Sequence, residues 1–268
     1  PAGVFFGIKS IIGPGCVVDI DKFKKEIKML NDGGIKTEGL VFIAENTHII
    51  TERHRWKDSE EIKIGTTRTG NGPCYSSKYA REGWPASSVS ELYEEFYYNN
   101  PEAEVLCEGA QGFALDIDWG DYPYVTSSHC TSAGALLNGF PPASIRKVFG
   151  VTKAYETYVG SKKFQPKGRI FEAVQKLGQE FGATTGRPRQ CNWINLTQMQ
   201  KACRINGVTN LIINKIDILE NIDRWTAHVG AKEGAGMMTF MNKEQFCDYI
   251  EYYFDGIDVI FSGNPERI

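Results

Sequence analysis

The stretch NLIINKID, residues 210–217, decides the fold class of this chain. Its first residues are apolar and rich in isoleucine without alternation, which is typical of a strand buried in a parallel sheet. A lysine and an aspartate follow where this strand would end. In open α/β sheets, ligands bind beyond the carboxyl ends of the strands. The stretch therefore predicts an α/β fold and a ligand site that includes Lys215 and Asp217.

Other segments of the chain repeat this alternation of strand and helix. Short apolar runs predict further strands at 39–44, 103–108, 147–152 and 257–262. Helical periodicity predicts helices at 19–34, 88–98, 169–181, 195–205 and 242–254. We expect Asp21 to cap the first helix and Gly33 to end it. Because no internal repeat or linker interrupts the pattern, we expect residues 1–268 to form a single α/β domain.

The composition is that of an ordinary globular protein. Hydrophobic residues make up 41% and charged residues 24% of the 268 residues, and no apolar run reaches membrane-spanning length. The formal net charge of −3 gives no general attraction to nucleic acid or anionic lipid. The seven cysteines are widely spaced and form no CxxC pair, which indicates reduced thiols in the cytoplasm and argues against zinc. We therefore expect no nucleic-acid or membrane partner and no zinc site.

Three glycine-rich loops carry further chemistry. IGTTRTGNGPCYSSKYAR (64–81) resembles a phosphate cradle, although Asn71 stands where a Walker loop has lysine. EGAQGFALDIDWGDYPYVTSS (108–128) offers carboxylates that suit metal binding or acid/base work, or equally the capping of turns. EFGATTGRPRQ (180–190) presents hydroxyls and two guanidinium groups that suit a carboxylate or phosphate, with an ordinary solvated loop as the alternative.

The motif NKID adds base specificity to the predicted strand end. A carboxylate at Asp217 can accept hydrogen bonds from N1–H and the exocyclic amine of guanine, while the stem of Lys215 can lie over the purine ring. Adenine presents no matching pair of donors, so the motif favours guanine. Motifs this short also arise by chance, but its position after a strand supports the functional interpretation.

Together, EGAQGFALDIDWGDYPYVTSS, IGTTRTGNGP, KAYETYVG, EFGATTGRPR and NKIDIL resemble the adenylosuccinate synthetase family, whose members join L-aspartate to IMP with GTP. The resemblance runs from SIIGPG (10–15) to FSGNPER (261–267), nearly the whole chain. It implies a ligase of purine biosynthesis that uses GTP and Mg²⁺. It also implies a mostly parallel central sheet flanked by helices, related to P-loop GTPases, in a cytoplasmic homodimer.

The resemblance implies residues for the IMP site. Thr67 and Arg81 would hold the IMP phosphate, with Arg81 reaching in from the partner subunit. Gln111 would face the purine O6 and is the one catalytic contact implied within the chain. Thr126 would bind the nucleotide phosphate, and Val159 would line the IMP pocket.

The resemblance also implies residues for L-aspartate and GTP. The loop GATTGR would close over the carboxylates of aspartate, with donors at Thr184, Thr185, Arg187 and Arg189. Lys215 and Asp217 would read guanine, with Ser262 near the same base, and Arg189 would also serve the GTP site. No metal ligand is implied.

Several family features are changed or lie outside the chain. Arg68-Thr69 replaces Gly-Arg, His129-Cys130 replaces Asn-Thr, Tyr158 replaces an arginine, and Asn264 replaces a glycine. The family's catalytic Asp, glycine-rich phosphate loop and catalytic His belong to motifs that precede the equivalent of Pro1, and none of the four histidines takes their place. We therefore expect the intact protein to continue upstream.

Two alternatives to the family's usual reaction stay open. The first is the phage-type enzyme that joins aspartate to dGMP. The loop GATTGR and the motif NKID favour the usual reaction, whereas His129-Cys130 keeps the phage type open. The region between Leu219 and Ile257 is short for the family, as in archaeal and viral members. The second alternative is a nucleotide-binding or dimerising module without catalysis.

Overall fold

The computed structural model describes residues 2–88, 93–94, 103–182, 186–230 and 236–264. The chain forms two compact units, Pro1–Ser144 and Ile145–Ile268. Six of the described strand pairings are parallel and two are antiparallel. The predicted α/β fold with mostly parallel strands and flanking helices is confirmed. The single domain over 1–268 stays a prediction.

The first unit contains two small parallel sheets. One has three strands in the order β1-β3-β5 and the other pairs β2 with β4. The residues Val18, Ile43, Ile49 and Ala86 form its buried cluster, against which the first helix packs Phe23. The elements are β1 (Ser10–Ile12), β2 (Val17–Val18), α1 (Ile20–Asp32), β3 (Val41–Ala44), β4 (His48–Ile49) and β5 (Tyr93–Glu94).

Helix α1 begins at a different cap from the one that the sequence predicts. Asp19 is the N-cap, and its Oδ1 accepts hydrogen bonds from the backbone N–H groups of Asp21 at 3.1 Å and Lys22 at 3.2 Å. The prediction of Asp21 as cap is wrong, because a cap needs extended backbone and Asp21 already lies in the first turn. Gly33 ends the helix as predicted.

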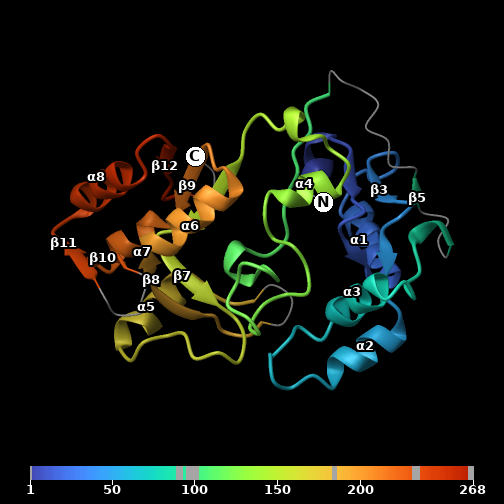
Figure 1. Cartoon of the computed structure of the whole chain (residues 1–268), viewed down its shortest axis with the longest axis horizontal. Coiled ribbons are helices and arrows are strands. Elements are labelled where there is room, and N and C mark those ends of the chain that lie inside the picture. The colour runs from blue at the N-terminus through green and yellow to red at the C-terminus, as the bar shows by residue number, and fades with distance from the viewer. Residues whose placement is uncertain (1, 89–92, 95–102, 183–185, 231–235, 265–268) are drawn as a thin grey trace. The chain divides into compact units, whose positions relative to one another are not determined.

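Helices α2 (Glu52–Ser59) and α3 (Asn71–Tyr79) lie side by side in the first unit (Figure 1). Gly70 permits this close packing. A Cβ added there would lie 2.8 Å from Ile50 Cγ2, and the residue has φ +88°. Its N–H donates to the buried Asp58 Oδ2 at 2.8 Å, which fixes the start of α3.

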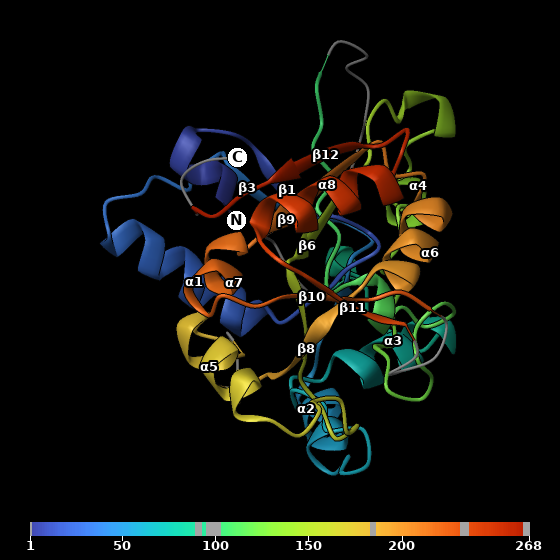
Figure 2. The same cartoon turned by 90° about the vertical axis from the view of Figure 1, so that its left-hand side faces the viewer.

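The second unit holds the strands around NKID. One sheet has three parallel strands in the order β12-β9-β6, seen side by side in Figure 2. The other sheet has four strands in the order β11-β10-β8-β7, of which only β10 and β8 pair in parallel. Ile213 of β9 pairs with Phe261 of β12, and Asn214 pairs with Lys153 of β6. The strands are β6 (Phe149–Lys153), β7 (Tyr155–Tyr158), β8 (Gln190–Asn195), β9 (Asn210–Asn214), β10 (Trp225–His228), β11 (Met237–Phe240) and β12 (Asp258–Phe261).

Four helices complete the core of the second unit. Phe246 of the last helix is fully buried, and its ring centre lies 5.4 Å from that of Trp225 and 5.5 Å from that of Phe240. This aromatic cluster packs the helix against β10 and β11. The helices are α5 (Arg169–Leu177), α6 (Leu196–Asn206), α7 (Ile216–Asn221) and α8 (Lys243–Tyr253).

Three predicted elements differ from the structure. Residues 103–108 form no strand, because no described strand pairs with this largely exposed run. Within the predicted helix 88–98, Tyr93–Glu94 instead pair in parallel with Ile43 and Ala44 as β5, and the rest lies almost entirely outside the described residues. The helix predicted over 169–181 ends at Leu177, where Gly178 caps it.

The remaining elements are short. They are η1 (Ala2–Phe6), η2 (Ala86–Ser88), η3 (Phe113–Leu115), α4 (Ala133–Leu137) and η4 (Pro142–Ser144). Among the described helices, none combines the length and the apolar character that crossing a membrane requires.

Candidate nucleotide and carboxylate sites

The carboxyl ends of β9 and β12 bring together the three residues predicted to read guanine. Ser262 N–H donates to Ile213 O at 2.9 Å, and Ile216 N–H donates to Ser262 O at 3.3 Å. A Cβ added at Gly263 would lie 3.4 Å from Asp217 Cβ, so the chain after β12 passes against Asp217. Lys215, Asp217 and Ser262 therefore occupy one strand edge, as the sequence predicts.

Two polar side chains at the end of β9 differ in their hydrogen bonding. The Asn214 Oδ1 atom is buried and has no hydrogen-bond partner within the described residues. A buried carbonyl without a partner costs about 1–3 kcal/mol, which a bound donor can recover. Lys215 has a left-handed backbone with φ +64°, and its Nζ donates to Gly178 O at 3.0 Å. The lysine stem is thus held in one direction.

Unusual backbone angles coincide with several predicted site residues. Within the described residues, six non-glycine residues have φ between +47° and +65°. Three of them, Arg81, Gln111 and Lys215, are predicted ligand contacts, and Arg68 follows the predicted contact Thr67. Such conformations cost roughly 1–3 kcal/mol and cluster at functional sites. Arg68 stands where the family pattern has glycine, and its φ of +56° is one that glycine adopts without strain and arginine does not.

A buried carboxylate, Glu180, lies at the base of the loop GATTGR. Its side chain is 2% exposed and forms ion pairs with Lys153 at 2.7 Å and with Arg189 at 3.1 Å. The Tyr155 hydroxyl donates to its other oxygen at 2.7 Å. The sequence analysis did not identify Glu180, Lys153 or Tyr155, because nothing in a single sequence marks this glutamate as buried.

The charge states of this cluster follow from its contacts. Burial would raise the pKa of Glu180, but hydrogen bonds from Lys153 and Tyr155 and the nearby positive charges outweigh it and lower the pKa. Burial raises the pKa of Tyr155, and the bond to Glu180 adds to the rise. Burial lowers the pKa of Lys153, while Glu180 opposes this shift. At neutral pH the glutamate is therefore ionised and the tyrosine is protonated.

The loop around GATTGR closes on itself. Gly182 N–H donates to Arg187 O, and Gly186 N–H donates to Gly182 O, each at 2.8 Å. Phe181 and Pro188 form an isolated antiparallel bridge below them. Arg187 and Arg189 are half-buried and flank this closed loop. Two of the predicted aspartate contacts, Thr184 and Thr185, lie outside the described residues.

In the loop 108–128, Asp116 acts as a structural cap. Its side chain is fully buried, and its Oδ1 accepts from the N–H groups of Asp118 and Trp119 at 3.0 Å. Its Oδ2 accepts from Cys130 N–H at 2.6 Å. Of the two interpretations that the sequence left open for these carboxylates, turn capping therefore holds for Asp116. The cap folds the segment that presents Gln111, which is exposed, and Thr126, which is half-buried.

Gly120 fills the tightest point of this loop. A Cβ added there would lie 2.5 Å from Ala114 O and 2.6 Å from Asp116 O, both rigid backbone atoms. We expect Gly120→Ala to lower the melting temperature by several degrees, because the loop must shift. Gly134→Ala in α4 is the matched control, since no atom lies within 4 Å of its added Cβ. Thermal unfolding checks both variants, and equal stabilities would contradict this account of the loop.

One cluster within the described part of the chain has the composition of a metal site. Ligand atoms of Asp116, Asp118 and His129 lie within 4.8 Å of one another. Mg²⁺ prefers oxygen ligands in near-octahedral geometry, whereas both Asp116 oxygens already accept backbone hydrogen bonds. The cluster does not fit Mg²⁺. The prediction that the chain supplies no metal ligand stays a prediction.

The loop that carries Thr67 is held by Glu61. The Glu61 carboxylate accepts from the N–H groups of Lys63 at 2.7 Å, Ile64 at 3.1 Å and Gly65 at 3.3 Å. These are N–H groups of the kind that a phosphate cradle uses. The hydroxyls of Thr67 and Thr69, 2.9 Å apart, remain on the outer side, where Thr67 is exposed. A phosphate here would bind the hydroxyls or displace Glu61.

The remaining predicted contacts lie at ends of elements. Arg81 is exposed just after α3, and Val159 is half-buried just after β7. The structure thus brings Lys215, Asp217 and Ser262 together in the second unit, with Lys215 bonded to the segment that leads into the loop of Arg187 and Arg189. For Thr67, Arg81, Gln111 and Thr126, which belong to the first unit, a shared site stays a prediction.

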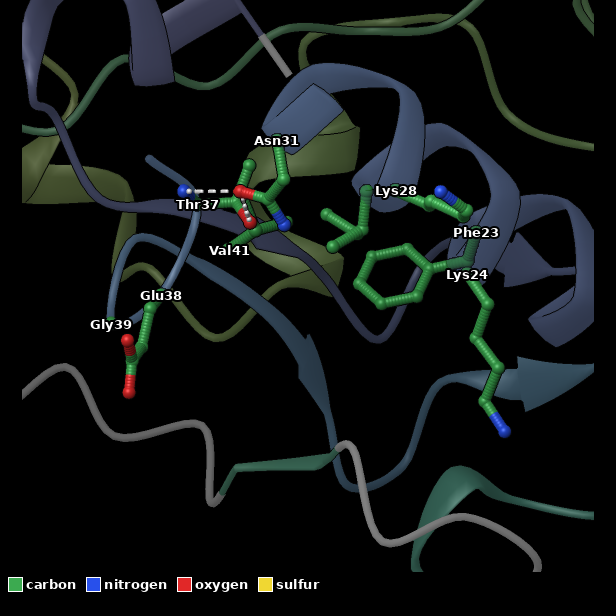
Figure 3. A pocket seen from close by; sticks show the side chains of 9 residues that line it. Phe23, Lys24, Lys28, Asn31, Thr37, Glu38, Gly39 and Val41 are labelled. Atoms are coloured by element: carbon green, nitrogen blue, oxygen red, sulfur yellow. Dashed lines mark hydrogen bonds between the residues drawn. The ribbon is translucent and has the colours of Figure 1, made fainter. Parts of the chain in front are cut away.

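A separate cavity of ≈ 500 Å³ lies between α1 and β3 (Figure 3). On its wall, Asn31 Oδ1 accepts hydrogen bonds from Thr37 N–H at 3.3 Å and from the Thr37 hydroxyl at 3.0 Å. None of the predicted site residues lines it. The lining residues are Phe23, Lys24, Ile27, Lys28, Asn31, Thr37, Glu38, Gly39 and Val41.

Known proteins resemble this chain in sequence. A sequence model of the adenylosuccinate synthetase family matches residues 1–100 and 86–245. The adenylosuccinate synthetase of Thermodesulfovibrio yellowstonii is 34% identical over 91% of this chain and 71% of its own length. That of Phocaeicola vulgatus is 32% identical over 99% of this chain and 74% of its own length. That of Chlorobium chlorochromatii is 36% identical over 83% of this chain and 65% of its own length.

Two solved structures share the fold. The fully ligated adenylosuccinate synthetase of Plasmodium falciparum superposes with a TM-score of 0.87 at 23% identity, covering 99% of this chain and 85% of that one. The cyanophage S-2L succinoaminodeoxyadenylate synthetase, bound to dGMP and to dATP as energy donor, superposes with a TM-score of 0.61 at 21% identity. The match covers 94% of this chain and 83% of that one.

The fold places the chain among α/β proteins with a mostly parallel sheet flanked by helices, as in the Plasmodium falciparum enzyme. The family is narrower than that class. The chain belongs to the adenylosuccinate synthetase family, whose members are ligases. It spans about two thirds to three quarters of the length of the relatives that it matches.

Proposed function

We propose that the protein joins L-aspartate to IMP at the expense of GTP, giving adenylosuccinate, GDP and phosphate in purine biosynthesis. One observation carries the choice of nucleotide. Lys215, Asp217 and Ser262 meet at the ends of β9 and β12, beside the buried and unpartnered Asn214 Oδ1. A carboxylate and a lysine stem at one edge match the donors and the ring of guanine.

The proposed reaction has two steps that explain the need for GTP. The purine gives up its N1 proton to a base as O6 attacks the γ-phosphorus of GTP, GDP leaves, and the 6-oxygen becomes part of a phosphate ester. The amine of aspartate then attacks C6, the C6–O bond breaks, and inorganic phosphate departs with that oxygen. Gln111, exposed on its left-handed backbone, contacts O6 in this proposal. Thr67 and Arg81 hold the IMP phosphate, Thr126 binds the nucleotide phosphate, and Val159 lines the IMP pocket.

The second substrate is assigned to the loop around GATTGR. Thr184, Thr185, Arg187 and Arg189 bind the two carboxylates of aspartate, because fixed guanidinium groups form short charge-assisted hydrogen bonds with carboxylates. Arg189 also reaches the nucleotide. The hydrogen bonds from Gly182 N–H to Arg187 O and from Gly186 N–H to Gly182 O support this proposal, since they hold the two ends of the loop together beside Arg187.

The assembly and the cofactor belong to the same proposal. Mg²⁺ bound with GTP neutralises charge on the transferred phosphoryl group. The protein works as a cytoplasmic homodimer in which Arg81 serves the partner's site, and no nucleic acid or membrane takes part. The exposed position of Arg81 after α3 supports a role away from its own core.

The experiment compares four substrate mixtures with the whole protein: IMP or dGMP, each with GTP or ATP, and all with aspartate and Mg²⁺. We expect the product adenylosuccinate with IMP and GTP. Product from dGMP would establish the phage-type reaction, for which the shared fold of the cyanophage enzyme is a reason to test. Guanine-nucleotide binding without product in any mixture would instead establish an inactive module and reject the ligase.

A further inference from the structure

We propose that Glu180 is a positioning residue that orients Arg189 for binding an anionic substrate and links the loop around GATTGR to the guanine-reading lysine. This inference rests on the proposed function only in assigning aspartate as that anion. The carboxylate itself is 2% exposed and touches no solvent-facing ligand position. It therefore acts through Arg189 and Lys153.

The geometry fixes Arg189 at three points. Its Nη1 donates to Glu180 Oε2 at 3.1 Å, and its backbone N–H donates to Glu180 O at 2.9 Å. Its own carbonyl accepts from Gln175 Nε2 at 2.6 Å. An arginine side chain loses about 2 kcal/mol of rotamer entropy when it is ordered. Because Arg189 is already partly ordered in the absence of a ligand, binding an anion costs it less conformational entropy.

The charges of the cluster leave it attractive to an anion. One carboxylate faces two cations, Lys153 and Arg189, whose side chains are 21% and 30% exposed while the glutamate is 2% exposed. The negative charge thus lies inside and the surplus positive charge lies toward the outside. Lys153 Nζ also donates to Thr157 Oγ1 at 3.1 Å, whereas the guanidinium of Arg189 has five N–H donors and bonds to Glu180 through one nitrogen, Nη1.

The same short segment reaches the guanine edge. Gly178 O accepts from Lys215 Nζ at 3.0 Å, and Gln179 has a left-handed φ of +51°. Gly178 must be glycine for Glu180 to be held, because an added Cβ would lie 2.3 Å from the Tyr155 hydroxyl that bonds to Glu180. Residues 178–180 therefore connect Lys215 to Arg189 through three consecutive residues.

Stability alone gives a weak reason for this cluster. A buried ion pair costs several kcal/mol of desolvation per ion, and apolar residues of similar volume often stabilise a fold as well or better. We therefore explain the ionised Glu180 by its role in orienting Arg189 and Lys153. A purely structural glutamate would have the same effect on the protein whether or not Arg189 is present.

The test is a double-mutant cycle in the whole protein, with the KM for aspartate as the measured quantity. The variants are Glu180→Gln, Arg189→Gln and the pair together. We expect each single variant to raise the KM about tenfold or more, and the double variant to raise it no further than about twofold beyond Arg189→Gln. If Glu180→Gln multiplies the KM by the same factor in both backgrounds, the two residues act independently and the proposal is overturned.

Two further variants guard against loss of folding. Glu180→Asp keeps the charge on a shorter stem, and we expect it to restore part of the affinity lost in Glu180→Gln; equal losses in the two variants would reject an electrostatic role. Glu220→Gln breaks the exposed ion pair between Lys243 and Glu220, 3.3 Å long, and serves as the control with an unchanged KM.

A measurement without substrates separates this inference from the proposed reaction. Hydrogen exchange at the amide of Gly182, which bonds to Arg187 O, reports opening of the loop. We expect faster exchange in Glu180→Gln and no change in Glu220→Gln. If the wild-type protein forms no adenylosuccinate, the proposed function fails, and this exchange then decides the anchoring: faster exchange supports it and unchanged exchange rejects it.

Discussion

Replacing Asp217 by alanine is expected to weaken GTP binding at least about a hundredfold, because two hydrogen bonds from guanine to a carboxylate are lost at roughly 1.5–3 kcal/mol each. Binding of IMP should stay unchanged, since Asp217 lies at the end of β9 with Lys215 and Ser262. Isothermal titration calorimetry with each nucleotide measures both effects. The exposed Asp248 on α8 gives a matched control, Asp248→Ala, which should bind GTP normally.

A second substitution makes this prediction sharper. In Asp217→Asn the amide nitrogen donates a hydrogen bond, so the variant should lose GTP but accept the xanthine nucleotide, whose base has a carbonyl in place of the exocyclic amine. A preference that does not move toward xanthine, or equal losses for GTP and IMP in Asp217→Ala, would contradict the role of Asp217 as the guanine reader.

Replacing Arg187 by alanine is expected to raise the KM for aspartate strongly. Truncating one partner of a buried charge pair costs roughly 2–5 kcal/mol, equivalent to about thirtyfold or more. Arg187 is half-buried, and its carbonyl accepts from Gly182 N–H at 2.8 Å, so the backbone of the loop should survive the change. Steady-state kinetics at saturating IMP and GTP measure the effect.

The control for Arg187 is an arginine outside the loop. Arg204 is exposed near the end of α6, and Arg204→Ala should leave the KM for aspartate unchanged. The KM values for GTP and IMP should stay near wild type in both variants. If Arg187→Ala shows an unchanged aspartate dependence, the loop does not bind aspartate.

Local patterns in the sequence predict the strand-edge site well. The run 210–214 is apolar enough to require burial on both faces, and its partner strand at 258–261 has the same character. Because parallel strands end at one edge, the residues that follow them can be predicted to lie together even when the order of the strands in the sheet is not known. The positions of Lys215, Asp217 and Ser262 follow from this rule.

The wrong predictions have a common physical reason. The run 103–108 has strand propensity, but a strand forms only where a neighbour receives its hydrogen bonds, and this dependence is not local. Tyr93–Glu94 show the reverse case, since a helical pattern yields to pairing with β3. The choice of Asp19 over Asp21 as a cap depends on backbone angles that both residues could adopt.

Sequence reasoning missed Glu180 and left the role of Asp116 open, and both are buried acids with distant partners. Glu180 meets Lys153, 27 positions earlier, and Asp116 accepts from Cys130, 14 positions later. Both lie in segments with several glycines, Gly178 and Gly182 around Glu180 and Gly112 and Gly120 around Asp116, which is typical of exposed loops. Only the folded chain shows that Asp116 is fully buried and Glu180 nearly so.

The fate of one oxygen atom tests the central claim most directly. The whole protein is supplied with GTP, Mg²⁺, aspartate and IMP that carries oxygen-18 at the 6 position. The products are separated, and mass spectrometry measures the oxygen-18 content of each. Transfer of a phosphoryl group to O6, followed by displacement, predicts that the label leaves with inorganic phosphate and that adenylosuccinate is unlabelled. Unlabelled phosphate, with the heavy oxygen retained in the nucleotide, would contradict the account.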